Sequence, residues 1–475
     1  MASANKSRRF LEALLAFAAT FALLYFGNGL NPIWPLMWIA PLPVLWFSLR
    51  ASSRAAALVA GLAWLGGCLN LWRYLRVLGT PISAWFVIFG SAAVVFVLAV
   101  LLFRALTLRG APFTALLSLP SLWVAFEYIR NLATPHGTAG AIAYSQIRFL
   151  PILQLASLTG PWGISFFLLL VPAGIALALH LRATSPAQSR RILATTLGAL
   201  AALLIFGAVR LAIPQPGPHV RVGLIAADKR TAPAGTRTQS LLQDYAQRAR
   251  TLALQGPQVI VLPEKIVAVT SAGKSAADSI LQQLADQTHT AIVAGVDRES
   301  PSVAFNQARV YRPGVPVATY DKEHLLPPFE ARFTPGTSLL QLHIGPFPWG
   351  LAICKDMDFI QPSRTYGRTR VGLMLVPAWD FNIDRAWHGH IAIMRAVEDG
   401  FSLVRSAKFG YLTVTDNRGR ILAERRSDAA PFATLLASVP AGHSWTLFQL
   451  LGNWFAWLSI ALAAFSTLRL ARLRK

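Results

Sequence analysis

The sequence predicts a polytopic α-helical membrane domain of eight spans combined with one α/β domain, and three observations support this fold class. Hydrophobic residues make up 54% of the 475 residues, and the mean hydropathy is +0.47, which is too apolar for an ordinary soluble enzyme. Eight apolar stretches are each close to the roughly 20 residues that a helix needs to span a bilayer. Before the last of them, strand-like and helix-like patterns alternate over more than two hundred residues. The predicted parts are a seven-helix membrane domain (1–212), an α/β domain (213–445) and an eighth span with a tail (446–475).

The apolar stretches are expected to be membrane-spanning helices. They lie near residues 10–26, 32–49, 55–75, 84–106, 113–130, 162–182, 192–211 and 446–468. The fifth is the weakest, because Glu127 and Arg130 stand at its end. The first is expected to be a retained helix and not a signal peptide, since it lacks a clean cleavage site and more helices follow at once. The loop over 131–161 is apolar, so we expect it to lie in or on the membrane.

The positive charge of the chain predicts its orientation. Of the net charge of +23, residues 213–445 contribute 25 Lys and Arg against 19 Asp and Glu, whereas the rest contributes 19 against 2. This distribution is typical of membrane topology and not of a nucleic-acid groove, so no nucleic-acid partner is expected. With a cytoplasmic N-terminus, 14 Lys and Arg flank the cytoplasmic helix ends and 4 lie in the short outer loops. Both termini are therefore predicted to be cytoplasmic, with residues 213–445 on the outer side.

Residues 213–445 predict a mostly buried sheet with covering helices. Strand-like runs lie at 219–227, 258–264, 290–296, 303–312, 350–354, 371–379, 402–408 and 411–416. Helical patterns lie at 238–254, near 275–288 and near 385–399. The region has no glycine-rich phosphate loop, CxxC or HExxH. The histidines at 324, 343, 388 and 390 lack a metal-binding spacing, so no metal site is expected.

Three reactive side chains follow apolar runs of the predicted sheet. Glu264 ends QVIVLPE, Lys322 follows VPVATY, and Cys354 ends GLAIC. Cys68 is the other cysteine, and both are expected to be free thiols. A thiolate is a nucleophile, a carboxylate can take its proton, and a lysine can stabilise an oxyanion. Taken singly, each residue has an ordinary interpretation, as a small buried hydrophobe or a solvated turn residue. The backbone N–H of Lys355 is a candidate second oxyanion donor.

The residues around these positions carry a family resemblance. The segments are LPE (262–264), YDKEHLLPPFE (320–330), GLAICKDMDF (350–359), RAVEDG (395–400) and RSAKFG (405–410). They resemble motifs of the nitrilase, or carbon–nitrogen hydrolase, superfamily. WVAFEYIR, AYSQ and LQLASLTGPWGISFF in the apolar part resemble signatures of one membrane-bound branch of it, the apolipoprotein N-acyltransferase family. The plan of eight spans with a domain before the last is also similar.

The resemblance implies a fold, a site and a function. It implies a nitrilase-like αββα sandwich with the catalytic triad Glu264, Lys322 and Cys354. The supporting or substrate-binding candidates are Glu330, Asp356, Lys355, Asn306 and Trp379. A phospholipid would acylate the cysteine, and the thioester would pass its acyl chain to the N-terminal diacylglyceryl-cysteine of an apolipoprotein, without a cofactor. The implied location is the bacterial inner membrane, with the catalytic domain facing the periplasm, and we expect a monomer.

The sequence also departs from the family pattern. Lys355 replaces an aromatic residue, and Asp356 replaces a glutamate. PPFE replaces PFGE, so Phe329 stands where the family has glycine, and Pro327 and Pro328 are expected to stiffen this loop. The side chain of Lys355 is expected to turn outward, because in a strand the residue after an inward-facing one points to the other face.

Two alternatives use the same residues differently. A membrane-tethered amidase or nitrilase would release an acid, because water would take the acyl group. An acyltransferase with another acceptor belongs to the same alternative. A non-catalytic lipid-binding scaffold is the second alternative, and retention of all three candidate triad residues speaks against it.

Overall fold

The computed structural model describes residues 2–229, 237–270, 274–300 and 302–473. Arg474 and Lys475, which enter the charge comparison above, lie outside the described residues. The chain divides into two compact units. One contains residues 1–134, 140–212 and 451–475, and the other contains residues 135–139 and 213–450.

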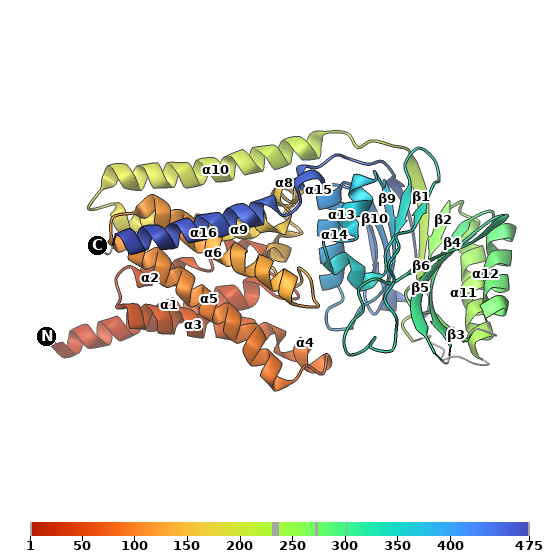
Figure 1. Ribbon diagram of the computed structural model, residues 1–475, viewed down its shortest axis with the longest axis horizontal. Coiled ribbons are helices and arrows are strands. Elements are labelled where there is room, and N and C mark those ends of the chain that lie inside the picture. The colour runs from red at the N-terminus through yellow and green to blue at the C-terminus, as the bar shows by residue number, and fades with distance from the viewer. Residues whose placement is uncertain (1, 230–236, 271–273, 301, 474–475) are drawn as a thin grey trace. The chain divides into compact units, whose positions relative to one another are not determined.

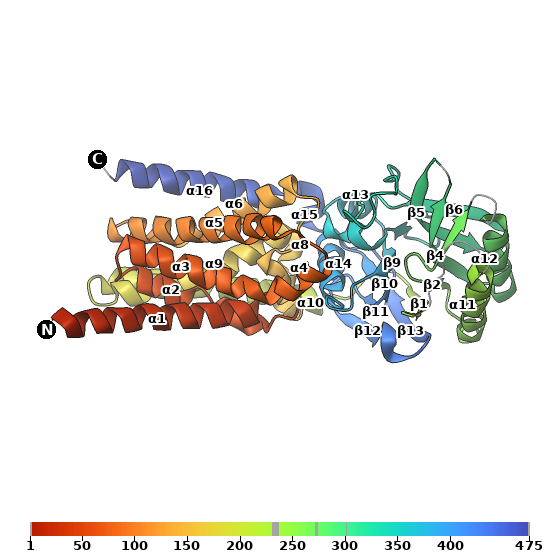
Figure 2. The ribbon, with the colours of Figure 1, turned by 90° about the horizontal axis from the view of Figure 1, so that it is seen from below.

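The first unit is a bundle of long apolar helices, which run side by side in both views (Figures 1 and 2). Within the described residues, seven helical segments are long and apolar enough to cross a membrane. They are α1 (Ala2–Gly27), α3 (Ser53–Cys68) continued by η2 (Leu69–Leu71) and α4 (Trp72–Val77), α5 (Ile82–Leu108), α6 (Pro112–Ala133), α9 (Pro161–Leu181), α10 (Pro186–Ala212) and α16 (Trp454–Arg472). Helix α6 packs against α5, α9 and α16. Outer faces expose large apolar side chains such as Phe10, Phe86 and Ile205, which is favourable against lipid and not against water.

The apolar stretch over 32–49 differs from the expected single span. It forms a 3-10 helix, η1 (Trp34–Trp38), and a short helix, α2 (Leu42–Ser48). Pro35, Pro41 and Pro43 lack the N–H that an uninterrupted helix requires, which explains the break.

The segment between α6 and α9 is folded into short helices. They are η3 (Ile142–Gln146), α7 (Leu150–Leu153) and α8 (Ala156–Thr159). Glu127 of α6 accepts hydrogen bonds from Trp123 Nε1 at 3.0 Å and from the backbone N–H of Ile142 at 2.9 Å. The carboxylate that weakened the predicted fifth span therefore ties this segment to α6.

The second unit is a sandwich of two sheets between two pairs of helices (Figure 1), and the predicted αββα fold is confirmed. Within the described residues, one sheet has the order β13-β1-β2-β4-β5-β6, with β3 beside β4, and the other has the order β12-β11-β10-β9-β8-β7. The first sheet contains β1 (His219–Ala226), β2 (Val259–Val261), β3 (Val267–Thr270), β4 (Ala291–Glu299), β5 (Ala304–Arg312), β6 (Val315–Asp321) and β13 (Ala433–Pro440). The second contains β7 (Gln341–Leu342), β8 (Trp349–Leu351), β9 (Leu373–Trp379), β10 (Ser402–Lys408), β11 (Tyr411–Thr415) and β12 (Ile421–Arg426). The covering helices are α11 (Arg237–Ala253) and α12 (Lys274–Thr288) on one side, and α13 (Ser363–Arg368) and α14 (Trp387–Asp399) on the other; η5 (Ser427–Ala429) and α15 (Leu447–Leu451) are short.

Apolar side chains fill the space between the two sheets. Leu224 of β1, Leu351 of β8 and Leu375 of β9 belong to this core and are fully buried. A second core lies between the first sheet and helices α11 and α12. Strands β1, β2 and β4 are parallel, as are β8, β9 and β10, so each set ends at one edge of its sheet. Segments that follow β2 and β8, together with the end of β9, carry candidate site residues.

All eight predicted strands and three predicted helices of this region are present, with small shifts at their ends. The sequence pattern did not indicate β3, β7, β12 or β13, and β6 entered only as the apolar run before Lys322. Strands β3 and β7, with four and two residues, are too short to show an alternation. Strand β12 is largely exposed and carries charged residues, so it lacks an apolar alternation. Strand β13 pairs antiparallel with β1 although about 200 residues separate them, and no local pattern reports such a partner.

Candidate active site

Cys354 lies at a strained turn, and its side chain faces a cavity. It follows β8 by three residues and begins the 3-10 helix η4 (Cys354–Asp358). Its φ of +43° is in the left-handed region, which costs a non-glycine residue about 1 kcal/mol or more. The residue is 9% exposed, and Sγ donates to the backbone carbonyl of Trp379 at 3.5 Å. The turn thus holds the thiol in one orientation at the edge of the second sheet.

Asp356 connects this turn to the segment that follows β6. Its Oδ2 accepts hydrogen bonds from the N–H of Ile353 at 2.9 Å and from the hydroxyl of Tyr320 at 2.8 Å. Its Oδ1 accepts from the N–H groups of Glu323 at 3.1 Å and His324 at 2.8 Å. The carboxylate is fully buried. A predicted supporting residue therefore lies behind the site, where it joins the loop that carries the thiol to the loop that carries the candidate lysine.

Lys322 is the centre of a buried ionic network. Its Nζ donates to Glu264 Oε1 at 2.9 Å and to Glu330 Oε2 at 2.8 Å. Asn306 of β5 bridges the same carboxylates, with Nδ2 donating to Glu264 Oε1 at 2.6 Å and to Glu330 Oε1 at 2.8 Å. Lys265 Nζ lies 2.5 Å from Glu330 Oε1. Two lysines thus balance two carboxylates, and the structure brings together four of the candidate site residues, Glu264, Lys322, Glu330 and Asn306.

A close backbone approach positions Glu264. It lies three residues after β2, and its N–H donates to the carbonyl of Ala378 in β9 at 3.3 Å. A Cβ added at Gly295 of β4 would lie 2.4 Å from the Glu264 Cα. Only glycine fits there without displacing the segment that carries the carboxylate.

The charges of the network set the protonation of its members. Burial alone would lower the pKa of Lys322, but Glu264 and Glu330 raise it well above its usual range. Burial alone would raise the pKa of Glu330, but Lys322 and Lys265 lower it to about 2. Burial and then the charge of Glu264 raise the pKa of the Cys354 thiol well above its usual range, and Lys322 opposes this. The resting thiol is therefore neutral, and it needs a base to become a nucleophile.

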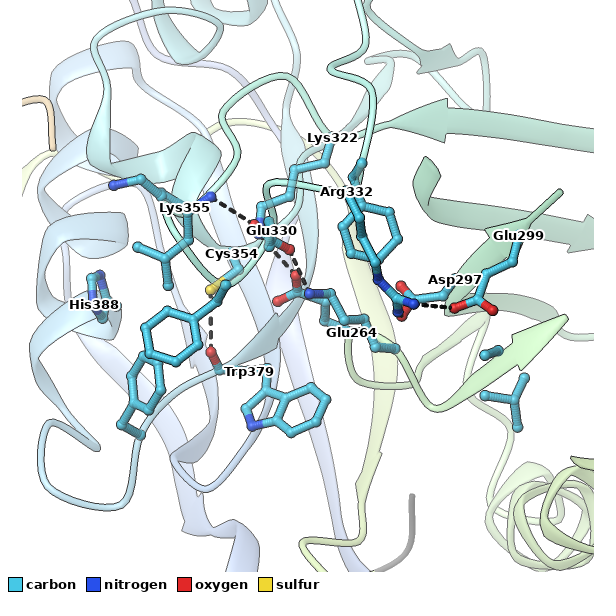
Figure 3. A pocket seen from close by; sticks show the side chains of 17 residues that line it. Glu264, Asp297, Glu299, Lys322, Glu330, Arg332, Cys354, Lys355, Trp379 and His388 are labelled. Atoms are coloured by element: carbon cyan, nitrogen blue, oxygen red, sulfur yellow. Dashed lines mark hydrogen bonds and ion pairs between the residues drawn. The ribbon is translucent and has the colours of Figure 1, made fainter. Parts of the chain in front are cut away.

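One cavity of about 620 Å³ joins these groups. The lining residues are Glu264, Lys265, Val267, Ala268, Asp297, Glu299, Lys322, Leu326, Phe329, Glu330, Arg332, Phe333, Cys354, Lys355, Trp379, Phe381 and His388. Figure 3 shows the sulfur of Cys354 between Glu264 on one side and Lys355 and His388 on the other. Part of the wall is aromatic, and the rings of Phe329 and Phe381 are 5.5 Å apart. The cavity thus combines an ionic centre with apolar surface suited to a hydrocarbon chain.

The side chain of Lys355 does not turn away from the site as expected. The residue is 3% exposed and lines the cavity. The expectation assumed strand alternation, but residues 354–358 form a 3-10 helix in which successive side chains do not alternate between two faces. Its Nζ lies 3.9 Å from Asp358 Oδ2.

Trp379 contributes its carbonyl to the thiol and its ring to a buried lysine. Lys408, the last residue of β10, places Nζ 3.6 Å from the centroid of the Trp379 ring and donates to the carbonyl of Lys265 at 2.8 Å. Lys408 is fully buried. It therefore contacts both Trp379 and Lys265, the residue after Glu264, and supports their positions at the cavity. Nothing in the local sequence RSAKFG indicates this role.

We expect Lys408 to make stability depend on pH. Burial lowers the pKa of Lys408 to about 7, whereas an unfolded lysine titrates near its ordinary value of 10.5. Between these values the unfolded chain binds more protons than the folded one, so stability rises with pH, by about 1.4 kcal/mol per pKa unit. Lys408→Met should flatten the rise in apparent unfolding temperature between pH 7 and pH 10 in detergent. The exposed substitution Lys229→Met is the control, and parallel curves for Lys408→Met and the wild type would contradict the expectation.

The sequence did not single out several residues of the cavity wall. Lys265 follows Glu264 directly, and its place beside a candidate catalytic residue was the one feature of the sequence that could have indicated its role. His388 appeared only as an unconvincing metal candidate, but it lies between Asp358 and Asp384, with Nδ1 at 3.0 Å and Nε2 at 3.3 Å from their oxygens. Asp297 and Arg332 reach the cavity from separate segments, and no pattern links them.

The chain is similar to known proteins over most of its length. Residues 13–174 match the family model described as Apolipoprotein N-acyltransferase N-terminal domain, and residues 222–444 match the one described as Carbon-nitrogen hydrolase. The chain is 28% identical to the apolipoprotein N-acyltransferase of Geobacter metallireducens, over 96% of this chain and 94% of the relative. It is 26% identical to that of Gloeobacter violaceus, over 90% and 88%. An amidase structure from Nesterenkonia sp. covers 48% of this chain and 92% of its own, with 24% identity and a TM-score of 0.41.

Proposed function

Because the chain belongs to the apolipoprotein N-acyltransferase family, we propose that it moves an acyl chain from a phospholipid, through a thioester on Cys354, to the N-terminal amine of a diacylglyceryl-cysteine apolipoprotein. The observation that carries the proposal is the joint presence of a thiol, a carboxylate and a lysine at one largely apolar cavity. The partners are the phospholipid, the apolipoprotein and the bilayer, and the protein acts as a monomer. No cofactor enters the reaction.

In the first half of the proposed reaction, Glu264 takes the proton of the Cys354 thiol. The sulfur attacks the ester carbonyl carbon of the phospholipid, the ester C–O bond breaks, and the lysophospholipid oxygen leaves with the proton from Glu264. The raised pKa of Cys354 supports a general base, because the thiol does not ionise unaided near neutral pH. The tetrahedral oxyanion accepts hydrogen bonds from Lys322 Nζ and from the N–H of Lys355, near the start of η4, where N–H groups lack partners within the helix.

In the second half, the amine of the acceptor attacks the thioester carbonyl. Glu264 takes the proton that the amine loses, the C–S bond breaks, and the thiol regains a proton as the amide forms. Water competes with the amine at this stage. The aromatic wall around Phe329, Phe333 and Phe381 supports transfer over hydrolysis, because apolar surface disfavours bound water.

The test incubates the purified protein with phospholipid and a diacylated lipopeptide and determines the masses of the products. The proposal expects lysophospholipid and a lipopeptide that is heavier by one acyl group. Free fatty acid with an unchanged lipopeptide would favour a membrane-bound hydrolase, and neither product would favour a non-catalytic scaffold.

The family and the apolar helices indicate a bacterial membrane protein, and we propose that residues 213–445 face the periplasm with both termini cytoplasmic. The asymmetry of Lys and Arg at the helix ends supports this orientation, which requires the broken segment η1–α2 (Trp34–Ser48) to cross the membrane as an eighth span beside the seven long helices. A periplasm-dependent reporter fused after Ala226 should be active. A reporter that is active only in the cytoplasm should be silent at the same position, and the reverse pattern would overturn the orientation.

A further inference from the structure

The cavity wall opposite Glu264 carries a buried cation that lacks a hydrogen-bond acceptor. Within the described residues, Lys355 Nζ makes no hydrogen bond. Two groups stabilise its charge. Asp358 Oδ2 lies 3.9 Å from Nζ, and the centroid of the Phe359 ring lies 5.4 Å from it in a cation–π contact. An ammonium has three donors, and burying it without acceptors is unfavourable.

Asp358 compensates Lys355 incompletely, because it is already paired with another cation. Its Oδ1 lies 3.0 Å from His388 Nδ1. Burial alone would lower the pKa of His388, but Asp358 and Asp384 raise it to about 10, so this imidazole is positively charged near neutral pH. Burial and then the charge of Lys355 lower the pKa of His136 to about 4. Asp358 is therefore shared between Lys355 and His388, and the second carboxylate of the cluster, Asp384, lies beside His388, with Oδ2 3.3 Å from Nε2.

The position of Lys355 in the cavity suggests what supplies the missing acceptor. Lys355 directly follows the nucleophile and lines the same cavity. Figure 3 places Lys355 on the side of Cys354 away from Glu264. An acceptor group that binds Lys355 Nζ therefore lies close to the ester that Cys354 attacks, either on the same molecule or on one bound beside it. Burial lowers the pKa of Lys355, and a bound anion would favour its charged form.

We propose that Lys355 binds the phosphate of the acyl donor and thereby makes the protein prefer glycerophospholipids over uncharged esters. This inference rests on the proposed function. A glycerophospholipid carries an anionic phosphodiester on the same three-carbon backbone as its acyl esters, so one molecule presents a carbonyl to the sulfur and a phosphate to a nearby ammonium. Lysine is a common phosphate-binding residue, and an aromatic residue at this position would provide no comparable charge.

The experiment follows acylation of Cys354 by intact mass with three donors in detergent micelles. The donors are phosphatidylethanolamine, the diacylglycerol with the same chains, and a p-nitrophenyl ester of the same acid. Lys355→Met should lower kcat/KM for the phospholipid by roughly 10- to 100-fold, the range expected for a hydrogen bond to a charged group, mostly through KM. Lys355→Met keeps the backbone N–H that is proposed to contact the oxyanion and removes only the ammonium, so rates with the two uncharged donors should stay within about twofold, which also shows that the variant is folded. Lys355→Arg should restore much of the preference, and Arg425→Gln, an exposed change on β12, is the control for lost positive charge.

The outcomes separate this inference from the proposed function. Equal loss with all three donors would assign Lys355 to the oxyanion or to folding and would overturn the phosphate contact. No loss with the phospholipid would overturn it as well, and in both cases the acyltransferase proposal would stand. If inorganic phosphate accelerates acylation by diacylglycerol to the phospholipid rate in the wild type, the site takes a free anion, and the donor contact is wrong. A wild type that no phospholipid acylates would overturn the proposed function and this inference with it.

Discussion

Replacement of Cys354 by alanine is expected to abolish acyl transfer, with a loss of at least about 10⁴-fold, because no other group at the cavity can form the thioester. Sγ is the proposed attacking atom, and alanine removes it while keeping the backbone that holds the turn. Intact mass after incubation with phospholipid alone should show one added acyl chain on the wild type. The same spectrum should show none on the Cys354→Ala variant.

Cys68 provides a matched control for this experiment. It is the other cysteine of the chain, it is also a free thiol, and it ends α3 in the helical unit. Cys68→Ala should keep the acyl adduct and nearly full transfer. A further variant, Glu264→Gln, keeps the size of the proposed base and removes its ability to take a proton, so it should acylate slowly. An adduct on Cys68, or full activity of Cys354→Ala, would contradict the proposed thioester mechanism.

Lys322→Met is expected to lose nearly all transfer, by roughly 10²- to 10³-fold or more, because a charged partner of the oxyanion disappears. The same change leaves Glu264 and Glu330 as two buried carboxylates without their shared ammonium. Breaking a buried ion pair on one side typically costs about 3–5 kcal/mol, so the apparent unfolding temperature should fall as well. A low rate alone would therefore not distinguish catalysis from folding.

A double substitution separates these two effects. Lys322→Met combined with Glu330→Gln removes one positive and one negative charge, so it should recover much of the lost thermal stability. It should not recover acylation of Cys354, because the proposed oxyanion partner is still missing. Recovery of both stability and rate in the double variant would show that Lys322 serves only to neutralise the carboxylates.

The sequence by itself determined most of the fold and singled out three candidate residues that the structure brings to one cavity. Long apolar stretches and the 3.6-residue and two-residue periodicities are local, so the main helices and strands could be predicted within a few positions. Glu264, Lys322 and Cys354 each carry a distinctive flanking motif, and the structure brings all three to one cavity. These features need only a short window of sequence.

The tertiary structure decided what depends on distant partners. Asp356 joins two loops more than 30 residues apart, and Lys408 supports the segment after Glu264 from across 143 residues. Lys355 faces the cavity because the chain leaves β8 in a 3-10 turn, and Asp356 within this turn accepts hydrogen bonds from Ile353 and from the distant residues Tyr320 and His324. The physical reason is common to all three. A buried charge takes the orientation that its acceptors and the surrounding packing allow, and these are assembled only when the two sheets close on each other.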